Sequence, residues 1–270
     1  MTREGAKAVE GRVRKGSYAA PALDKAFQII ELLADHPEGL LVSEMAVALG
    51  RSLGELFRIV VVMEEARYLE KSPVDDRYRV TYKFLDIAYR ATPARRLTAA
   101  ALPEMQTLAL TAGQSCHLVV IEGSAGLVIA REENPGTRGF ALRMGASIDI
   151  VNSCSGKVLL AFSGVTQVTR IIDRLELVHG RPVGRARLTE ELDRVRAQGF
   201  ELRESPITRG VTDISYPVFG FGGEFMAALT IPFLETIDGS QSVTIPEARA
   251  LLAETTERIS AHLGHRPGEA

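Results

Sequence analysis

At 270 residues, the chain is long enough for two domains of ordinary size, each with its own core. Hydrophobic residues make up 46% and charged residues 24%, which is typical of globular proteins and excludes a disordered chain, a collagen-like rod and a coiled coil. No apolar run approaches the roughly 20 residues of a membrane span, and the N-terminus lacks the apolar core of a secretory signal. We therefore expect a cytoplasmic protein without membrane contact. The net charge of −2 does not by itself indicate nucleic acid, so evidence for DNA must come from local motifs.

Residues 1–18 are predicted to form a disordered basic tail, because basic residues exceed acidic ones there and apolar residues are few. A domain at residues 19–82 follows, beginning with a helix over Pro21–Ala34 whose inward stripe is Leu23, Phe27, Ile30 and Leu33. A short second helix is expected to be capped by Ser43 and to end at Gly50. A third helix runs from about Ser52 to Arg67, and its inward residues are expected to be Leu53, Leu56, Ile59, Val60 and Met63.

Residues 68–81 are predicted to form two short strands joined by a polar turn, because Ser72-Pro73 and Asp75-Asp76 stand between alternating residues. Three helices followed by such a hairpin are typical of a winged helix-turn-helix, in which the third helix enters a major groove and the wing touches the phosphate backbone.

A linker helix at residues 83–93 is expected to lead into a second domain at residues 94–270, which opens with a long helix to about residue 112. Strand patterns follow at residues 116–123, 126–132, around 139–144, 210–220 and 224–233. Helix patterns lie at 155–162, at 165–178, at 188–198 with Thr189 at its start, and from Pro246 to about Leu263. The second domain is therefore predicted to be α+β with a largely antiparallel sheet.

Four segments in this order resemble the IclR-type transcription regulators, over about residues 20–264. They are YRVTYKFLDIA at 78–88, NSCSGKVLLAF at 152–162, LDRVRAQGFEL at 192–202, and RGVTDISYPVFG with AALTIP at 209–232. The resemblance implies a winged helix-turn-helix, a linker helix and a GAF-like α/β effector-binding domain. It also implies a homodimer or tetramer on palindromic double-stranded DNA, and control of catabolic genes by small organic acids, often aromatic or keto acids.

The predicted DNA contacts combine residues of the third helix with basic residues of the wing, because arginine is the usual bidentate reader of guanine and also holds phosphate. They are Arg51, Ser52, Glu55, Arg58, Lys71, Arg77 and Arg79. Gly54 and Glu55 stand where family members commonly carry a Ser-Thr pair before the arginine, and Glu55 either accepts from a cytosine amino group or repels phosphate. Residues 17–90 hold nine Lys/Arg against twelve Asp/Glu, so affinity must depend on a few placed arginines, the tail and dimer avidity.

The predicted effector site lies at the start of the helix at 155–162, and the resemblance to the IclR family implies that the strand pair at 210–233 forms its opposite wall. Backbone N–H groups and hydroxyls at a helix start favour an anionic effector. The predicted residues are Ser153, Cys154, Ser155, Gly156, Lys157, Asp213, Ser215, Tyr216, Thr230, His117 and Met144. Met144 fits ordinary core packing equally well. The segment before Lys157 lacks the full phosphate-loop pattern, so nucleotide binding is rejected.

No metal site, cofactor or catalytic residue is predicted. Cys116, His117 and Cys154 have no metal-binding spacing, and the serines around Cys154 do not fit the frame of a serine hydrolase. Two alternatives stay open: a DNA-binding protein whose second domain only oligomerises, and an acyl-hydrolase-type enzyme.

Overall fold

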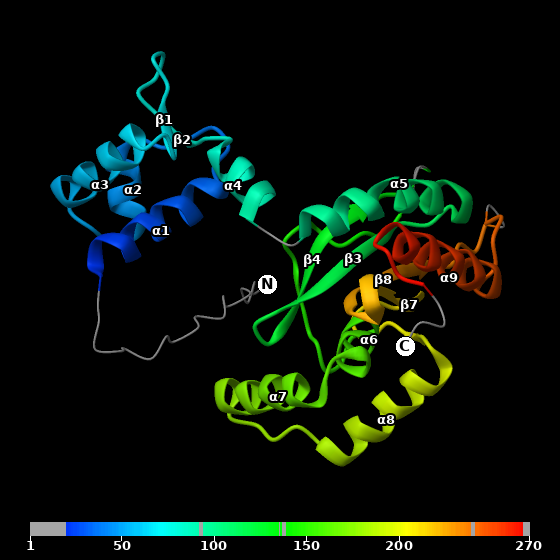
Figure 1. Cartoon of the computed structure of the whole chain (residues 1–270). Helices are drawn as coiled ribbons and strands as arrows, with labels where there is room; N and C mark the ends of the chain where they lie inside the picture. The colour runs from blue at the N-terminus through cyan, green and yellow to red at the C-terminus, as the bar shows by residue number, and fades with distance from the viewer. Residues whose placement is uncertain (1–19, 92–93, 135, 137–138, 239–240, 267–270) are drawn as a thin grey trace, which may run out of the picture. The chain divides into compact units, whose positions relative to one another are not determined.

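The computed structural model of the chain describes residues 20–91, 94–134, 136, 139–238 and 241–266. The chain divides into two compact units, residues 1–92 and 93–270. The basic tail expected at residues 1–18 lies outside the described residues, as does part of the junction between the units. Each unit has its own hydrophobic core. Figure 1 shows the helices and strands of both units along the chain.

The N-terminal unit contains three helices, a two-stranded hairpin and a fourth helix. In chain order these are α1 (Pro21–Ala34), α2 (Val42–Leu49), α3 (Leu53–Glu65), β1 (Leu69–Lys71), β2 (Tyr78–Val80) and α4 (Lys83–Ala91). The strands β1 and β2 pair antiparallel, and Leu40 adds an isolated bridge to Tyr78. This is the winged helix-turn-helix that the sequence predicts.

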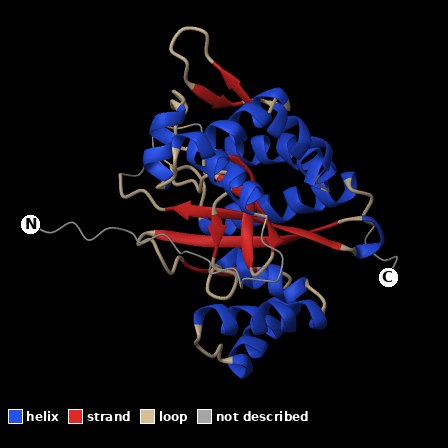
Figure 2. Cartoon of the chain, turned by 90° about the vertical axis from the view of Figure 1, so that its left-hand side faces the viewer, coloured by secondary structure: helices blue, strands red, loops and turns tan. Residues whose placement is uncertain are grey.

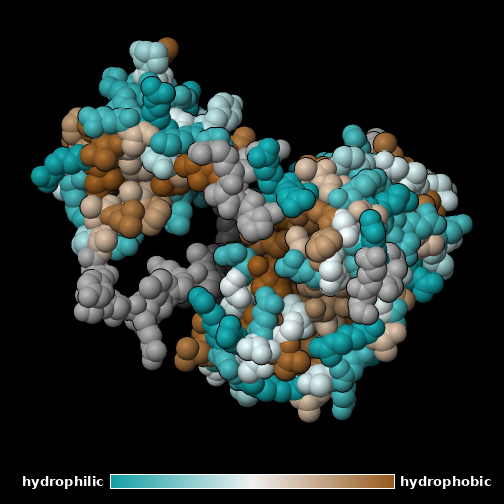
Figure 3. Space-filling model, in the orientation of Figure 1, coloured by the Kyte–Doolittle hydropathy of each residue, from teal (hydrophilic) through white to brown (hydrophobic). Residues whose placement is uncertain are grey.

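The buried face of α1 is shifted from the predicted stripe. Ile29 and Leu33 are buried, whereas Leu23 and Phe27 are 52% and 54% exposed. On α3, Leu56, Val60 and Met63 are buried as expected, but Leu53 is exposed. Spacing alone did not select the correct face, because each of these helices carries more apolar residues than this small unit buries. The surplus forms part of the hydrophobic surface of the unit (Figure 3).

The start of α2 differs from the prediction that Ser43 caps it. The helix begins two residues earlier, at Val42, and its N-cap is Leu41, whose backbone N–H donates to the Glu44 carboxylate at 2.9 Å. The predicted end is correct, because Gly50 takes the left-handed backbone conformation that favours glycine.

The C-terminal unit is built on a six-stranded antiparallel sheet with the strand order β5-β4-β3-β8-β7-β6. Its strands are β3 (Cys116–Glu122), β4 (Ala125–Glu132), β5 (Ser147–Ile148), β6 (Glu201–Glu204), β7 (Val211–Phe219) and β8 (Phe225–Leu234). Its helices are α5 (Ala94–Ala112), α6 (Cys154–Phe162), α7 (Val165–His179), α8 (Arg185–Gln198) and α9 (Ile245–His262), with a short 3-10 turn at Phe221–Gly223.

Helices cover both faces of this sheet (Figure 2). On one face, α5 and α9 pack through Met105, Leu108 and Leu252. On the other, α6 to α8 pack through Val158, Leu159 and Leu192. The predicted fold class, an N-terminal winged helix-turn-helix with a linker helix and a GAF-like α/β domain, is confirmed.

Two expectations for this unit were wrong in detail, and one strand was not predicted. Residues 139–144 form no strand, and β5 instead lies at Ser147–Ile148. The helix expected to open at Thr189 begins at Arg185 after the N-cap Gly184. The short edge strand β6 was missed, because Glu201–Glu204 holds a single apolar residue and gives no alternating pattern.

Candidate effector pocket and DNA-reading surface

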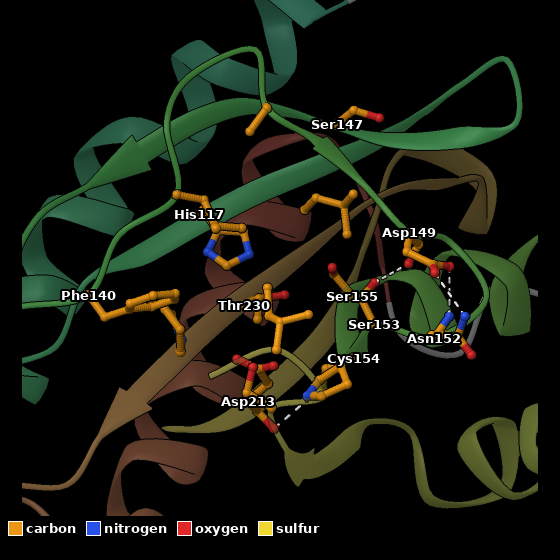
Figure 4. A pocket seen from close by; sticks show the side chains of 17 residues that line it. His117, Phe140, Ser147, Asp149, Asn152, Ser153, Cys154, Ser155, Asp213 and Thr230 are labelled. Carbon is orange, nitrogen blue, oxygen red and sulfur yellow. Dashed lines mark hydrogen bonds between the residues drawn. The ribbon is translucent and has the colours of Figure 1, made fainter. Parts of the chain in front are cut away.

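A cavity of about 230 Å³ lies in the C-terminal unit between the sheet and the start of α6 (Figure 4). His117, Thr230 and Asp213 reach it from β3, β8 and β7, and Ser153 and Ser155 face them across the space. The lining residues are His117, Phe140, Leu142, Ala146, Ser147, Ile148, Asp149, Asn152, Ser153, Cys154, Ser155, Ser205, Pro206, Ile207, Asp213, Thr230 and Pro232. The lining thus joins apolar walls to a set of convergent polar groups, a combination typical of ligand sites.

The helix α6 is capped by Ser153 at its N-terminus. The Ser153 hydroxyl accepts from the Gly156 N–H at 3.0 Å. The first-turn N–H groups of Cys154 and Ser155 have no acceptor inside the helix, so they are available to an anion. Gly156 is needed here because a Cβ would come within 2.6 Å of the Ile150 Cα, which leaves no room for any larger residue.

The turn before α6 is held by Asp149. Its carboxylate accepts from the backbone N–H of Val151 at 2.9 Å and of Asn152 at 3.0 Å, and from the Asn152 side chain at 2.8 Å. Burial alone would raise the pKa of Asp149, but the hydrogen bonds from Asn152 and Val151 lower it below its usual value. Asp149 is therefore a fixed negative charge at the edge of the cavity.

The sheet side of the cavity is a row of three polar residues. His117 is directly paired with Thr230, and Thr230 with Ser215, so their side chains share one face. The Thr230 hydroxyl donates to that of Ser215 at 2.8 Å, and Ser215 is fully buried beneath it. His117 is 3% exposed, and among the described residues no partner reaches its buried Nδ1. Burial lowers the pKa of His117 to about 4, so the ring is neutral.

Asp213 is the second acidic group of the cavity and differs from Asp149. Burial raises its pKa to about 6, although a hydrogen bond from Ser205 and the charge of Arg203 oppose the rise. The Cys154 thiol lies 3.4 Å from the Asp213 carbonyl oxygen, which places the first residue of α6 against this strand. Asp213 thus lies beside the helix start where an anion is expected.

Of the predicted effector residues, Ser153, Cys154, Ser155, Asp213, Thr230 and His117 lie together around the cavity. The others do not line it. Gly156 donates to the Ser153 hydroxyl, and Ser215 is hydrogen-bonded to Thr230, so both contact lining residues. Lys157 forms an ion pair with Glu191 on α8 instead. Tyr216 stacks on Phe200, with ring centroids 5.1 Å apart, and Met144 is 58% exposed.

The sequence prediction missed the residues that reach the cavity from irregular segments, above all Asp149, Asn152 and Ser205. The Asp-x-x-Asn spacing before the Ser153 cap is a signal of an Asx turn that would have found the first two. Nothing in the sequence marks Ser205.

In the N-terminal unit, Arg51, Ser52 and Arg58 lie exposed on and before α3. Ser52 is the N-cap of α3, but its hydroxyl makes no capping hydrogen bond. Within residues 20–91, neither Arg51 nor Arg58 forms an ion pair, so both guanidinium groups are available for other contacts. Gly54 faces open space on the same surface.

Glu55 is engaged inside the protein, since its carboxylate forms an ion pair with Lys25 of α1. The Lys25 ammonium lowers the pKa of Glu55, so the group is ionised at neutral pH. This pairing neutralises a charge that would otherwise repel phosphate, and it ties α1 to the start of α3.

The three wing residues also have partners within the protein. Arg77 binds the Glu44 carboxylate through two contacts of 2.7 and 3.1 Å and donates to the Gly39 carbonyl. Arg79 donates to the Glu38 carbonyl, and Lys71 pairs with Asp76 at 2.7 Å in the turn. The Arg77 contacts attach the wing to the start of α2.

A model of the IclR helix-turn-helix domain matches residues 22–73, and a model of the bacterial transcriptional regulator IclR C-terminal domain matches residues 90–261. The chain belongs to the IclR family of transcription regulators. It is therefore a DNA-binding transcription regulator whose C-terminal domain binds effectors, and not an enzyme.

Curated relatives of this IclR-family chain are themselves regulators. The HTH-type transcriptional regulator XynR of Escherichia coli is 22% identical over 90% of this chain and 97% of its own. The glycerol operon regulatory protein of Streptomyces griseus is 27% identical over 73% of this chain and 78% of its own.

Solved structures of other IclR proteins share the fold. The IclR of Thermotoga maritima superposes with a TM-score of 0.69 at 24% identity, over 90% of this chain and 98% of that one. An IclR homologue from Microbacterium hydrocarbonoxydans, complexed with 4-hydroxybenzoate, gives 0.73 at 20% identity over 90% and 99%.

The thiols of this IclR protein are unsuited to catalysis. Burial raises the pKa of Cys116 to about 12 and that of Cys154 well above its usual value, so neither supplies a thiolate at neutral pH. In the described part of the chain, no three His, Cys, Asp or Glu residues gather as metal ligands, and no helix is long and apolar enough to span a membrane.

Proposed function

We propose that the chain regulates a catabolic gene cluster in the cytoplasm and responds to a small organic acid, with aromatic acids among the candidates. The observation that carries this proposal is the cavity between α6 and the sheet. It brings the free N–H groups of Cys154 and Ser155 together with hydroxyls and an apolar wall. A carboxylate fits the helix start, and an apolar body fits the rest.

The size of the cavity supports a ligand with one ring or a short chain. An engineered cavity of about 150 Å³ in another protein holds benzene, and this one measures about 230 Å³. Phe140, Leu142 and Ile148 supply apolar walls. The homologue from Microbacterium hydrocarbonoxydans was crystallised with a compound of this size, 4-hydroxybenzoate.

On the DNA side, we propose that a homodimer or tetramer binds a palindromic operator. Arg51 and Ser52 just before each α3, and Arg58 on it, reach the major groove, and the wing lies along the DNA backbone. Effector binding is proposed to change the dimer geometry and so the separation of the two α3 helices.

The effector proposal is tested by thermal unfolding of the full chain with aromatic, keto and hydroxy monocarboxylic acids. A ligand at 100 times its Kd stabilises the folded state by about 2.7 kcal/mol, which is readily detected. At least one acid should raise the melting temperature, while the matching amide should not. If all the acids leave the melting temperature unchanged, the result would favour the alternative in which the C-terminal domain only oligomerises.

A further inference from the structure

The charges around the cavity do not match those of a usual site for an organic acid. Anionic ligands are normally met by arginine or lysine, but none of the described lining residues is basic. Lys157 follows in the same helix, yet it is buried in its ion pair with Glu191. The lining instead holds two acids, Asp149 and Asp213.

The surroundings of Asp213 are mixed in charge, and the nearest cation, Arg203, shares its sheet face and opposes the rise in its pKa without lining the cavity. Arg203 is its cross-strand partner on β6 and lies outside the lining, and Glu201 on the same strand is paired with Arg194. From the other elements, the titratable groups that line the cavity are Cys154 on α6, His117 on β3 and Asp149 across the space, and the remaining polar lining groups are uncharged.

His117 does not supply the missing charge either. The residue is 3% exposed, and no described residue forms a hydrogen bond with its Nδ1. Burial lowers its pKa to about 4, so the ring is neutral at higher pH. A neutral imidazole offers one donor and one acceptor. It therefore orients a polar group of the ligand without neutralising a carboxylate.

Asp213 can bind a carboxylate in place of a basic residue, because its own carboxyl group is readily protonated. Its pKa is already raised to about 6 by burial. A ligand carboxylate in the same cavity raises it further, since two neighbouring carboxylates share one proton. A carboxylic acid that donates to a carboxylate makes a short, charge-assisted hydrogen bond.

We propose that Asp213 contacts the carboxylate of the effector directly and binds it as the protonated acid, so that one proton from solvent enters the complex with the effector. This inference rests on the proposed organic-acid function. The N–H groups of Cys154 and Ser155 bind the carboxylate from the other side. The site then senses the acid and the proton together, and favours monocarboxylates over dicarboxylates, which would bring a second charge.

The test is isothermal titration of the full chain at pH 5.5 and pH 7.5, with benzoate, 4-hydroxybenzoate, pyruvate and lactate as probes. These probes stay ionised over this range, and His117 stays neutral. With a pKa of about 6 for free Asp213, the affinity of the wild-type protein should fall about 25-fold from pH 5.5 to pH 7.5. Titrations in two buffers of different ionisation enthalpy should show uptake of close to one proton at pH 7.5.

Three variants separate contact from simple repulsion. Asp213→Asn keeps a donor without a charge, so its affinity should change less than about twofold between the two pH values. Asp213→Ala removes charge and donor together and should bind about tenfold more weakly than Asp213→Asn at both pH values. Glu204→Gln, which neutralises an exposed carboxylate on β6, should keep the wild-type pH dependence.

The outcomes are distinguishable. Wild-type affinity that does not change with pH, or equal affinity of the Asn and Ala variants, overturns the role of Asp213 and leaves the organic-acid proposal intact. Failure of all four acids to bind any of the proteins at either pH overturns the proposed effector class, and this inference falls with it.

Discussion

The raised pKa of Asp213 predicts how the stability of the free protein depends on pH, without any ligand. Its folded-state pKa of about 6 exceeds the ordinary value of 3.8, so the folded state holds the proton more tightly than the unfolded chain does. The stability contributed by the protonated group is complete below pH 3.8 and is lost as the pH rises to about 6 and above. Asp213→Asn removes this loss, so the variant should be the more stable protein at neutral pH.

The magnitude follows from the two pKa values. Their difference corresponds to a loss of about 3 kcal/mol once the pH exceeds both, of which about 2 kcal/mol develops between pH 4.5 and pH 7.5. Since Asp213 is only half-buried, solvent screening reduces the change in this interval to about 1 to 2 kcal/mol. For a unit of this size, the gap in melting temperature between Asp213→Asn and the wild type should widen by about 3 to 6 °C.

Differential scanning calorimetry of the full chain at several pH values from 4.5 to 7.5 measures this gap on the transition of the C-terminal unit. Glu204→Gln serves as the control, and its gap should not change with pH. A constant gap for Asp213→Asn would refute the reasoning, because it would show that Asp213 titrates alike in the folded and unfolded states.

The remaining predictions concern the helix starts and the DNA-reading surface. Gly156→Ala should destabilise the C-terminal unit by about 1 to 3 kcal/mol, because its Cβ has no room beside Ile150. Gly54→Ala, in open space on α3, should instead stabilise the N-terminal unit by up to about 1 kcal/mol. Urea unfolding followed by circular dichroism measures both changes. Arg77→Met should lower the melting temperature of the N-terminal unit, since the wing loses its bidentate contact with Glu44. Lys25→Met leaves the Glu55 carboxylate without its ion-pair partner, so repulsion of phosphate should weaken operator binding more at low salt than at high salt. Arg58→Ala should weaken operator binding at least tenfold and relax discrimination against mutated operators, as measured by fluorescence anisotropy; equal loss on every DNA sequence would show that Arg58 contacts only phosphate.

Much of the fold was predictable from local signals. The turn residues between β1 and β2, Gly50 at the end of α2 and the apolar runs of β3, β4, β7 and β8 identified the elements and their order. The buried face of α1 was not predictable from spacing, because Leu23, Phe27, Ile29 and Ile30 are all apolar and only tertiary packing selects among them.

The candidate site was predictable where it lies on regular elements. Ser153 and Ser155 at a helix start follow from capping, whereas Asp213 and Thr230 on paired strands follow from the resemblance to the IclR family. Asp149 and Ser205 were missed because they reach the cavity from turns, whose path no local pattern fixes. The ion-pair partners of Glu55 and Arg77 lie on α1 and α2. No local pattern in a single sequence predicts such long-range ion pairs.

The central claim is that an organic acid in the C-terminal cavity changes the affinity of this IclR-family protein for its operator. The most direct measurement is a gel-shift titration of the upstream intergenic DNA at low salt, with and without the acid that gives the largest thermal shift. The account predicts retardation by the free protein and a change of at least fivefold in apparent Kd on adding the acid, a typical coupling between two sites. It also predicts that Asp213→Ala needs about tenfold more acid than Asp213→Asn to reach the same change. An affinity for DNA that is the same with and without a bound acid would contradict the account.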